Sequence, residues 1–296
     1  MPYKIDIGAV YNIAPDRHNA SDKKAFMPLQ KEMVFDIDMN DYDDVRTCCQ
    51  GANVCERCFA YLKIAMRVIQ DTLHEDFDFS NLLWVFSGRR GIHAWVCDEQ
   101  ARQMTNEMRN AVVSYCNIGV GNENANRLQL EHPLHPRLRK VYGYLKQKFL
   151  EVIIRDHNLL RLEKHREKML AFLPRTPNDE LKNKVKNTWE NKLLEVTRQQ
   201  VAEADTSEEL WSIFTATYEQ WKTQNKIKTN DMSIEALVLT YLYPRIDVNV
   251  STGINHLLKS PWCVHPKTGK LPAAPHSRAL SRQDLRAHRS PSARRL

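Results

Sequence analysis

Four of the seven cysteines crowd into one short stretch, Cys48-Cys49-x₅-Cys55-x₂-Cys58. A Cys-x₂-Cys pair is a common zinc half-site, and the adjacent pair completes four thiolates within one loop. The odd total and this crowding favour an intracellular metal site over a secreted disulfide framework. Four thiolates close the coordination sphere, so the sequence predicts a structural zinc that constrains this loop; the alternative is four unrelated buried thiols.

The cysteines follow directly on an apolar run that carries two carboxylates, "KEMVFDIDMN". In a strand, alternate side chains share a face, so Asp36 and Asp38 should project together while Val34 and Phe35 anchor the strand. Adjacent carboxylates repel unless a cation lies between them, and oxygen ligands suit Mg²⁺ or Mn²⁺. The alternative is a strand end whose aspartates face solvent.

A third carboxylate lies in "RIDVNV", which has the alternation of a strand. Asp247 should stand on the polar face of that strand. Three carboxylates on neighbouring strands can hold two metal ions roughly 4 Å apart, as phosphate-transferring sites do. Taken alone, Asp247 would be an ordinary surface residue.

The segment "WVFSGRRGIHAWV" predicts two strands joined by a basic turn. Glycines let the backbone turn and expose N–H donors, and arginines can bind phosphate oxygens in bidentate fashion. The candidate phosphate-binding residues are Ser87, Gly88, Arg89, Arg90, Gly91 and, on the second strand, His93. The alternative is a hairpin turn that contacts only water. The segment lacks the Gly-Lys-Ser/Thr of a Walker A loop.

A second group of basic residues follows Asp247 in "INHLLKSPWCVHPKTGK". His256, Lys259, His265 and Lys267 close behind a metal-binding carboxylate would suit a triphosphate, although Lys267 with Gly269 also fits an ordinary turn. Cys97, Cys116 and Cys263 are expected to be core residues.

The texture of the chain changes along its length. Residues 1–131 alternate strand-like and helical patterns, whereas 132–243 carry long helical stripes such as Leu138, Val141, Leu145, Phe149 and Val152. Residues 244–270 return to the mixed texture. The segment 271–296 has six Arg and one Asp, thus +5 of the net +7, and reads as a disordered basic tail. No apolar stretch reaches bilayer length.

Together, "VFDID", "SGRRGIH" and "RIDVNV…GINHLLKSPWCVHPKTG" resemble the catalytic small subunit of eukaryotic DNA primase, of the archaeo-eukaryotic primase superfamily. The order of the motifs and the cysteine cluster between the first two match, over residues 1 to about 270. The resemblance implies an α/β (mixed α+β) primase catalytic core, with a zinc knuckle near 48–58 and an all-helical subdomain inserted at 132–243.

The resemblance also implies roles for individual residues. Asp36, Asp38 and Asp247 would hold the catalytic Mg²⁺ or Mn²⁺, and Cys48, Cys49, Cys55 and Cys58 the structural Zn²⁺. The turn residues would hold the phosphates of the incoming nucleotide, helped by His256, Lys259 and His265, and Lys4 and Asp6 would lie near that nucleotide.

The implied activity is the templated synthesis of short RNA primers for DNA replication, from ribonucleoside triphosphates on single-stranded DNA. The implied location is the nucleus. The implied partners are the large primase subunit, as a heterodimer, and the DNA polymerase alpha complex, with no membrane involved. Because family members have core sequence before "MPYKID" and after Lys270, we expect a truncated or alternative form of the subunit.

Two other functions remain open at this point. The chain could be a non-catalytic isoform that acts as a scaffold for the large subunit. It could also be another two-metal enzyme such as a nuclease, which would leave the Ser-Gly-Arg-Arg-Gly-Ile-His turn without a role.

Overall fold

The computed structural model describes residues 5–14, 16–17, 25–120, 128–199, 203–225 and 230–270. The chain divides into two compact units. The first contains the described residues of the segments 1–41, 51–118 and 244–296, and the second those of 42–50 and 119–243. The predicted mixed α/β class is confirmed. The predicted limits of the domains stay predictions, and Lys4 and the tail 271–296 lie outside the described residues.

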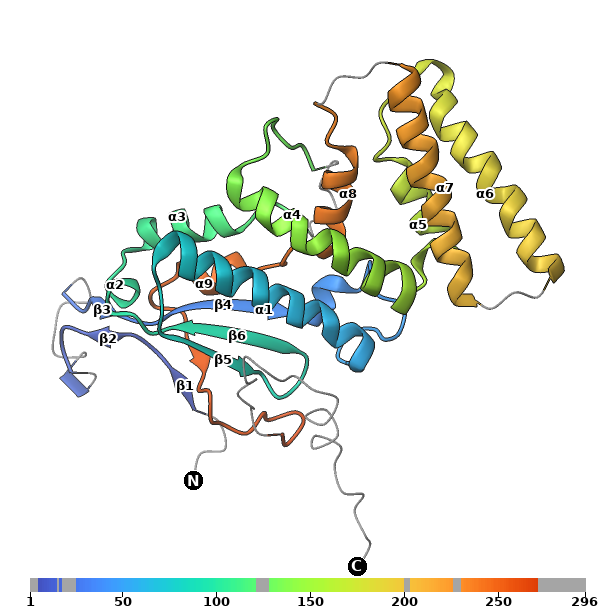
Figure 1. Ribbon diagram of the computed structural model, residues 1–296. Helices are drawn as coiled ribbons and strands as arrows, with labels where there is room; N and C mark the ends of the chain where they lie inside the picture. Colours follow the sequence, from blue (N-terminus) through green and yellow to red (C-terminus); the bar gives the residue numbers. More distant parts are fainter. Residues whose placement is uncertain are drawn as a thin grey trace, which may run out of the picture. The chain divides into compact units, whose positions relative to one another are not determined.

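The first unit is built on a three-stranded antiparallel sheet in the order β4-β6-β5 (Figure 1). Its strands are β4 (Met33–Asp38), β5 (Leu82–Phe86) and β6 (Gly91–Val96), each at a segment whose β-branched and aromatic residues predict a strand. Asp36 pairs with His93 and Asp38 with Gly91, while Val85 is opposite His93. Directly paired residues share a face, so Asp36, Asp38, His93 and Trp95 lie on one face of the sheet.

The opposite face is apolar and is covered by α1 (Glu56–Phe77). The helix buries the predicted stripe that runs from Leu62 to Leu73. Its Phe59 ring lies 5.9 Å from the ring of Phe86 on β5. Burial on this face therefore fixes the register of β4, because a slip of one residue would turn Phe35 outward and Asp36 into the core.

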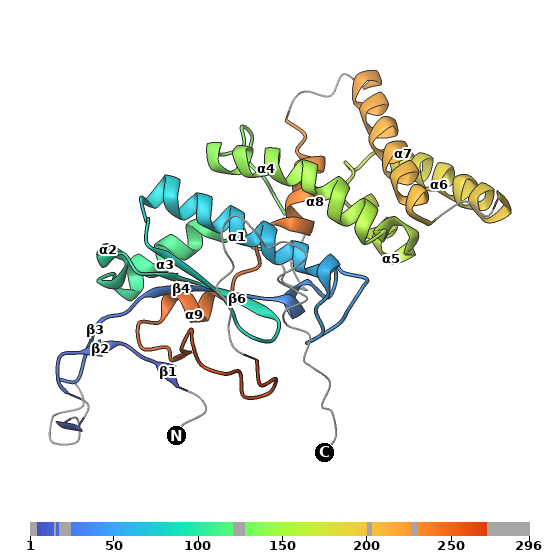
Figure 2. The ribbon, with the colours of Figure 1, turned by 60° about the horizontal axis from the view of Figure 1, so that its bottom comes forward.

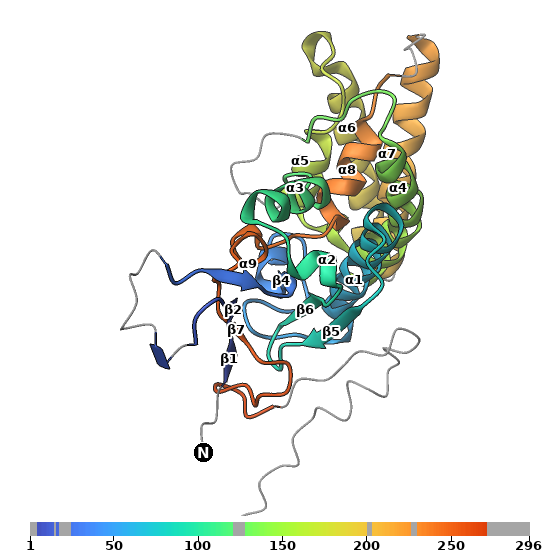
Figure 3. The same cartoon turned by 90° about the vertical axis from the view of Figure 1, so that its left-hand side faces the viewer.

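Two pairs of short strands also belong to the first unit. The pair β1 (Asp6–Ile7) and β7 (Leu258–Lys259) is antiparallel, as is the pair β2 (Val10–Tyr11) and β3 (Pro28–Gln30). Figure 3 shows β1, β2 and β7 below β4. Ile7 and Leu258 pack against a small cluster of Val34, Val85 and Trp95, which lies on the same face of the sheet as Asp36 and His93.

Three helices complete this unit: α2 (Glu99–Arg102), α3 (Asn106–Cys116) and α9 (Val248–Thr252). Buried Arg109 of α3 donates hydrogen bonds to the carbonyl oxygens of Lys31 and Glu32, just before β4 begins. The arginine thus anchors the start of the strand that carries the two aspartates.

The second unit is helical within the described residues. Its elements are α4 (Pro136–Lys148), the π-helical turn η3 (Phe149–Asp156), η4 (Leu159–Arg161), α5 (Glu163–Leu170), η5 (Pro177–Asp179), α6 (Glu180–Gln199), α7 (Glu203–Gln224) and α8 (Ser233–Leu242). Helices α6 and α7 pack side by side, with the ring of Trp189 stacked on Phe214 at 5.8 Å. No described helix is long and apolar enough to span a bilayer.

Two expectations from the sequence are wrong. "RIDVNV" is not a strand: Asp247 caps the N-terminus of the short helix α9, and its side chain accepts a hydrogen bond from the backbone N–H of Asn249 at 3.0 Å. The β-branched residues favour a strand, but the aspartate cap and packing on β4 and α3 outweigh that preference. Cys97, expected in the core, is exposed just past the end of β6, whereas Cys116 is buried.

Gly91 lies where β6 approaches β4 most closely. A Cβ added there would stand 2.8 Å from the carbonyl oxygen of Ile37, so Gly91→Ala should lower the free energy of unfolding by about 2 kcal/mol. The matched change is Gly143→Ala in α4, where no atom lies within 4 Å of the added Cβ, and alanine should stabilise by up to about 1 kcal/mol. Urea unfolding measures both; equal effects of the two changes would contradict the close approach.

Candidate functional site

The site begins with the pairing of β4 and β6. Asp36 is opposite His93, and the Nε2 of His93 lies 3.5 Å from a carboxylate oxygen of Asp36. Burial, with a contribution from Lys259, lowers the pKa of His93 to about 4. The imidazole is therefore neutral at pH 7, and it faces the carboxylate as a hydrogen-bonding group rather than as a cation.

Asp36 is the most perturbed carboxylate of the site. Burial, and after it repulsion by Asp38, Asp247 and Asp41, together raise its pKa to about 7, against an opposing effect of Arg90. Several carboxylates thus repel one another in a site that is partly shielded from water. A divalent cation would relieve exactly this kind of repulsion, and carboxylate oxygens are the ligands that Mg²⁺ and Mn²⁺ prefer.

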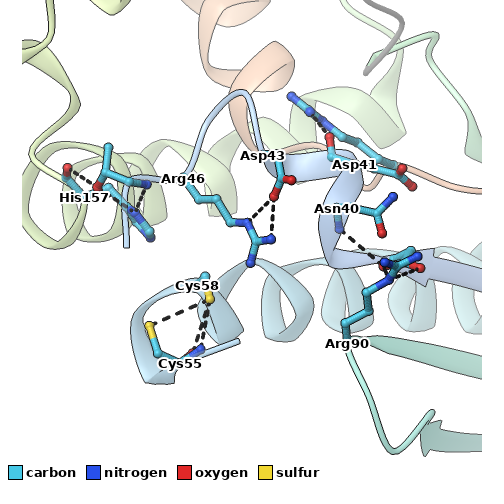
Figure 4. Close-up of polar contacts among 11 residues, drawn as sticks. Asn40, Asp41, Asp43, Arg46, Cys55, Cys58, Arg90 and His157 are labelled. Carbon is cyan, nitrogen blue, oxygen red and sulfur yellow. Dashed lines mark hydrogen bonds and ion pairs between the residues drawn. The ribbon is translucent and has the colours of Figure 1, made fainter. Parts of the chain in front are cut away.

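Asp38 is held by an arginine of the turn. The Nε of Arg90 lies 2.7 Å from one carboxylate oxygen and 2.8 Å from the other (Figure 4). Both side chains are about 30% exposed, at 28% for Arg90 and 30% for Asp38. The backbone N–H of Asn40 also donates to Asp38, at 3.3 Å. The arginine therefore links the acidic strand to the basic turn.

Asp247 joins the group although it is not on a strand. Its backbone N–H donates to the carbonyl oxygen of Asp36 at 3.0 Å, along the outer edge of β4. Figure 2 shows α9, which Asp247 caps, next to β4. The three predicted carboxylates come together from segments more than 200 residues apart in the chain.

One acidic residue of this group was missed by the sequence analysis. Asp41 lies in the short 3₁₀ helix η2 (Met39–Tyr42) directly after β4, and its carbonyl oxygen accepts a hydrogen bond from buried Arg245. Partial burial and the neighbouring Asp38 raise the pKa of Asp41. The sequence did show a third aspartate three residues after Asp38, just past the end of the strand. The period-two pattern ends at Asp38, however, and Asp41 is positioned by the 3₁₀ helix that follows.

The turn between β5 and β6 is organised by Ser87. Its backbone N–H donates to the carbonyl oxygen of Gly91 at 2.8 Å, and its Oγ accepts from the N–H groups of Gly91 and Arg89 at 3.1 and 3.4 Å. The prediction that backbone N–H groups face outward is therefore wrong for these two. Because Oγ is used as an acceptor, the hydroxyl hydrogen of Ser87 and the guanidinium groups are the donors suited to an anion.

The segment after β7 packs on this turn. Thr268 donates from its hydroxyl to the carbonyl oxygen of Gly88 at 2.8 Å. Gly88 has a φ of +83°, and a Cβ there would stand 3.1 Å from the Cβ of His265. Burial lowers the pKa of His265, as do Lys259 and Arg89 among its neighbours. Thus His265 and Lys259 approach the predicted phosphate-binding turn.

Asp6 and His256, both predicted to lie near the nucleotide, occupy different parts of the first unit. Asp6 pairs with Lys259 in the β1–β7 ladder, so it lies beside a basic residue of the site. His256 lies toward the other end of β4, where its carbonyl oxygen accepts a hydrogen bond from Lys31, two residues before the strand begins. The structure does not bring His256 to the turn, because the chain between α9 and β7 runs back along the strand.

The four predicted cysteines converge. The sulfur atoms of Cys48, Cys49, Cys55 and Cys58 all lie within 4.8 Å of one another. The sulfurs of Cys55 and Cys58 are 3.8 Å apart, at the start of α1 (Figure 4). Tetrahedral zinc with bonds of about 2.3 Å needs thiolate sulfurs about 3.8 Å apart, so this donor set fits a zinc ion.

The raised pKa of Asp36 predicts a pH-dependent stability. The folded chain keeps a proton on Asp36 that the unfolded chain loses from about pH 4 upward. Stability should therefore fall between about pH 4 and about pH 7, by up to about 4 kcal/mol at 1.36 kcal/mol per pKa unit. Asp36→Asn removes that loss, and so it should be more stable than the parent chain at pH 8 but not at pH 4.

Urea unfolding at pH 4, 6 and 8, in buffer without Mg²⁺ or Mn²⁺, measures this difference. Asp71→Asn is the control, because Asp71 pairs with Arg67 at 2.6 Å on the surface of α1. A difference between Asp36→Asn and the parent chain that is the same at all three pH values would contradict the assignment.

An antiparallel sheet whose polar face joins clustered carboxylates to a basic, glycine-containing turn defines an α/β protein with a site suited to divalent cations and phosphates. The sequence comparisons agree with this class. The family described as DNA primase small subunit matches residues 35–276. The chain therefore belongs to the DNA primase small subunit family.

Named relatives are similar over most of the chain. DNA primase small subunits of Schizosaccharomyces pombe, Drosophila melanogaster and Saccharomyces cerevisiae are 40%, 38% and 37% identical to it, each over 91% of its length. The aligned parts cover 58%, 60% and 64% of these relatives. The chain thus spans about three-fifths of the length of the curated relatives that it matches.

Proposed function

We propose that this chain is a catalytic primase subunit that joins ribonucleotides into short RNA primers on single-stranded DNA. The observation that carries the proposal is the convergence of Asp36, Asp38 and Asp247 beside the turn Ser87–Gly91. Membership of the primase small subunit family supports the same reaction. The large primase subunit and the DNA polymerase alpha complex are the proposed partners, and the nucleus is the proposed location.

The three aspartates are proposed to hold Mg²⁺ or Mn²⁺. Such ions, when bound, lower the pKa of an attacking hydroxyl and neutralise charge on the leaving pyrophosphate. Burial and repulsion by the neighbouring carboxylates raise the pKa of Asp36 to about 7, which supports this role, because a bound cation would offset the repulsion. Asp41 would add negative charge from the end of β4.

The basic residues are proposed to bind the triphosphate of the incoming nucleotide. Arg89 and Arg90 would take phosphate oxygens, with the Ser87 hydroxyl, Lys259 and His265 as further donors. Neutral His93, beside Asp36, would donate without adding charge. Asp6, next to Lys259 in the ladder, would lie near the same nucleotide. Catalysis then rests on positioning and charge neutralisation, without a protein nucleophile.

The activity is tested by de novo dinucleotide synthesis on a single-stranded template, with the chain alone and with the large subunit added. We expect a labelled dinucleotide that depends on the template and on Mg²⁺ or Mn²⁺. A chain that binds the large subunit but forms no product in either condition would contradict the proposal. That outcome would favour the scaffold function instead.

Arg90 predicts a competition between metal and protein for Asp38. Because Arg90 pairs with both oxygens of that carboxylate, Arg90→Gln should raise the Mn²⁺ affinity of the nucleotide-free chain about fivefold, the equivalent of about 1 kcal/mol. The same change should weaken binding of the nucleoside triphosphate. Mn²⁺ titration followed by electron paramagnetic resonance measures the first effect.

The control is Arg89→Gln, which removes an equal charge from the same turn without removing the pair with Asp38. We expect Arg89→Gln to weaken binding of the nucleoside triphosphate, but to change the Mn²⁺ affinity less than Arg90→Gln does. Equal Mn²⁺ affinities in the two variants would show that net charge, not the Arg90–Asp38 pair, sets the effect.

A further inference from the structure

The most exposed large apolar side chain among the described residues is Trp262, at 65%. Three other tryptophans, Trp84, Trp95 and Trp189, are buried. At 65% exposure the indole of Trp262 contributes little to the packing of the core. Large exposed apolar side chains often belong to binding surfaces, so we consider which residues surround it.

The backbone that presents Trp262 is fixed on both sides. The N–H of Ser260 donates to the carbonyl oxygen of Ile5 at 2.8 Å, and the N–H of Cys263 donates to the carbonyl oxygen of Ser260 at 3.2 Å. Lys259 donates from Nζ to the carbonyl oxygen of Cys263 at 3.1 Å. Pro261, buried between them, restricts the turn further. Trp262 is thus held out to solvent by an ordered turn.

The segment that carries Trp262 has charge of one sign. From Ser251 to Lys270 the chain contains no aspartate or glutamate, but it contains Lys259, Lys267 and Lys270. The same segment contacts the basic turn through the hydrogen bond from Thr268 to Gly88. The segment of Trp262 is therefore basic and contacts the proposed phosphate-binding turn, while Asp6, opposite Lys259 in the β1–β7 ladder, is an acidic residue of the neighbouring strand.

We propose that Trp262 stacks on an unpaired base of single-stranded DNA, while the neighbouring lysines contact its phosphates. An aromatic ring among cations is the chemistry that binds single strands without reading their sequence, since every base offers a π-face. This inference rests on the proposed function: the DNA bound at Trp262 would be the template from which the primer is copied. The three lysines of this segment favour a polyanion over an apolar protein partner.

Binding of fluorescein-labelled oligo(dT), followed by anisotropy at several salt concentrations, tests the proposal. Trp262→Ala should weaken binding about 5- to 150-fold, because stacking contributes about 1–3 kcal/mol per base. Trp262→Phe should bind within about threefold of the parent chain, since it keeps an aromatic face. The slope of log affinity against log salt should not change in either variant, because no charge is removed.

The controls separate stacking from apolar contact and from misfolding. Trp262→Leu keeps an apolar side chain but should lose affinity as alanine does. Leu257→Ala removes another exposed apolar side chain, 62% exposed, and should have little effect. Mg²⁺-dependent binding of a nucleoside triphosphate should be unchanged in Trp262→Ala, which shows that the fold and the nucleotide site are intact.

Three results would overturn the inference: a parent chain that does not bind oligo(dT), an alanine variant that binds it equally well, or a leucine variant equal to the parent. The last result would indicate an apolar contact surface for a protein partner. Failure of dinucleotide synthesis with oligo(dT) binding intact would instead count against the proposed function, so the two failures are distinguishable.

Discussion

Asp36→Ala is expected to reduce primer synthesis by about a thousandfold or more, which corresponds to about 4 kcal/mol of lost transition-state stabilisation. The reason is positional: Asp36 is central in the carboxylate group, paired with His93 across the sheet and bound through its carbonyl oxygen to Asp247. The dinucleotide assay with the large subunit present measures the effect.

The same substitution should not destabilise the chain in buffer without Mg²⁺ or Mn²⁺. It removes a carboxylate whose pKa is raised to about 7 by burial and by neighbouring negative charges. Loss of activity with equal or higher stability is therefore the expected pair of results. Asp71→Ala, on the surface of α1, is the control and should leave both quantities nearly unchanged. Primer synthesis by Asp36→Ala at the parent rate would show that the carboxylate has no part in catalysis.

Cys58→Ser is expected to remove zinc from the protein and to lower its thermal unfolding temperature by roughly 10 °C. Cys58 is buried at the start of α1, and its sulfur lies 3.8 Å from that of Cys55 and within 4.8 Å of the other two. An ion present at a thousand times its dissociation constant stabilises the fold by about 4 kcal/mol, and 1 kcal/mol shifts the midpoint by about 2–4 °C at this size.

Cys97→Ser is the matched change, because Cys97 is exposed and lies outside the cluster. It should retain one zinc per chain and the parent unfolding temperature. Elemental analysis of reduced, purified protein gives the metal content. Parent protein without zinc, or Cys58→Ser with a full complement, would contradict the structural zinc site.

Much of the site was predictable because its local signals are strong. The alternation in "VFDID" and "LLWVF" fixed the strands, and the apolar stripe of α1 determined which face of β4 is buried. Once Phe35 faces α1, Asp36 and Asp38 must share the other face. The cysteine spacing likewise predicted the convergence of four sulfurs that the structure shows.

The features that the sequence did not predict depend on contacts between distant segments. Asp247 was assigned to a strand because polar and apolar residues alternate in "RIDVNV", yet the hydrogen bond from its N–H to Asp36 and its capping of α9 decide its conformation. The pairing of Arg90 with Asp38 joins residues 52 apart in the chain. His256 is placed by Lys31, which no local pattern marks.

The central claim is that Asp36, Asp38 and Asp247 hold divalent cations beside a triphosphate on the Ser87–Gly91 turn. Anomalous diffraction from crystals grown with Mn²⁺ and a nucleoside triphosphate tests it most directly. We expect manganese peaks among these three carboxylates, with the phosphates against Arg89 and Arg90. Nucleotide bound elsewhere, or no manganese at the carboxylates, would contradict it.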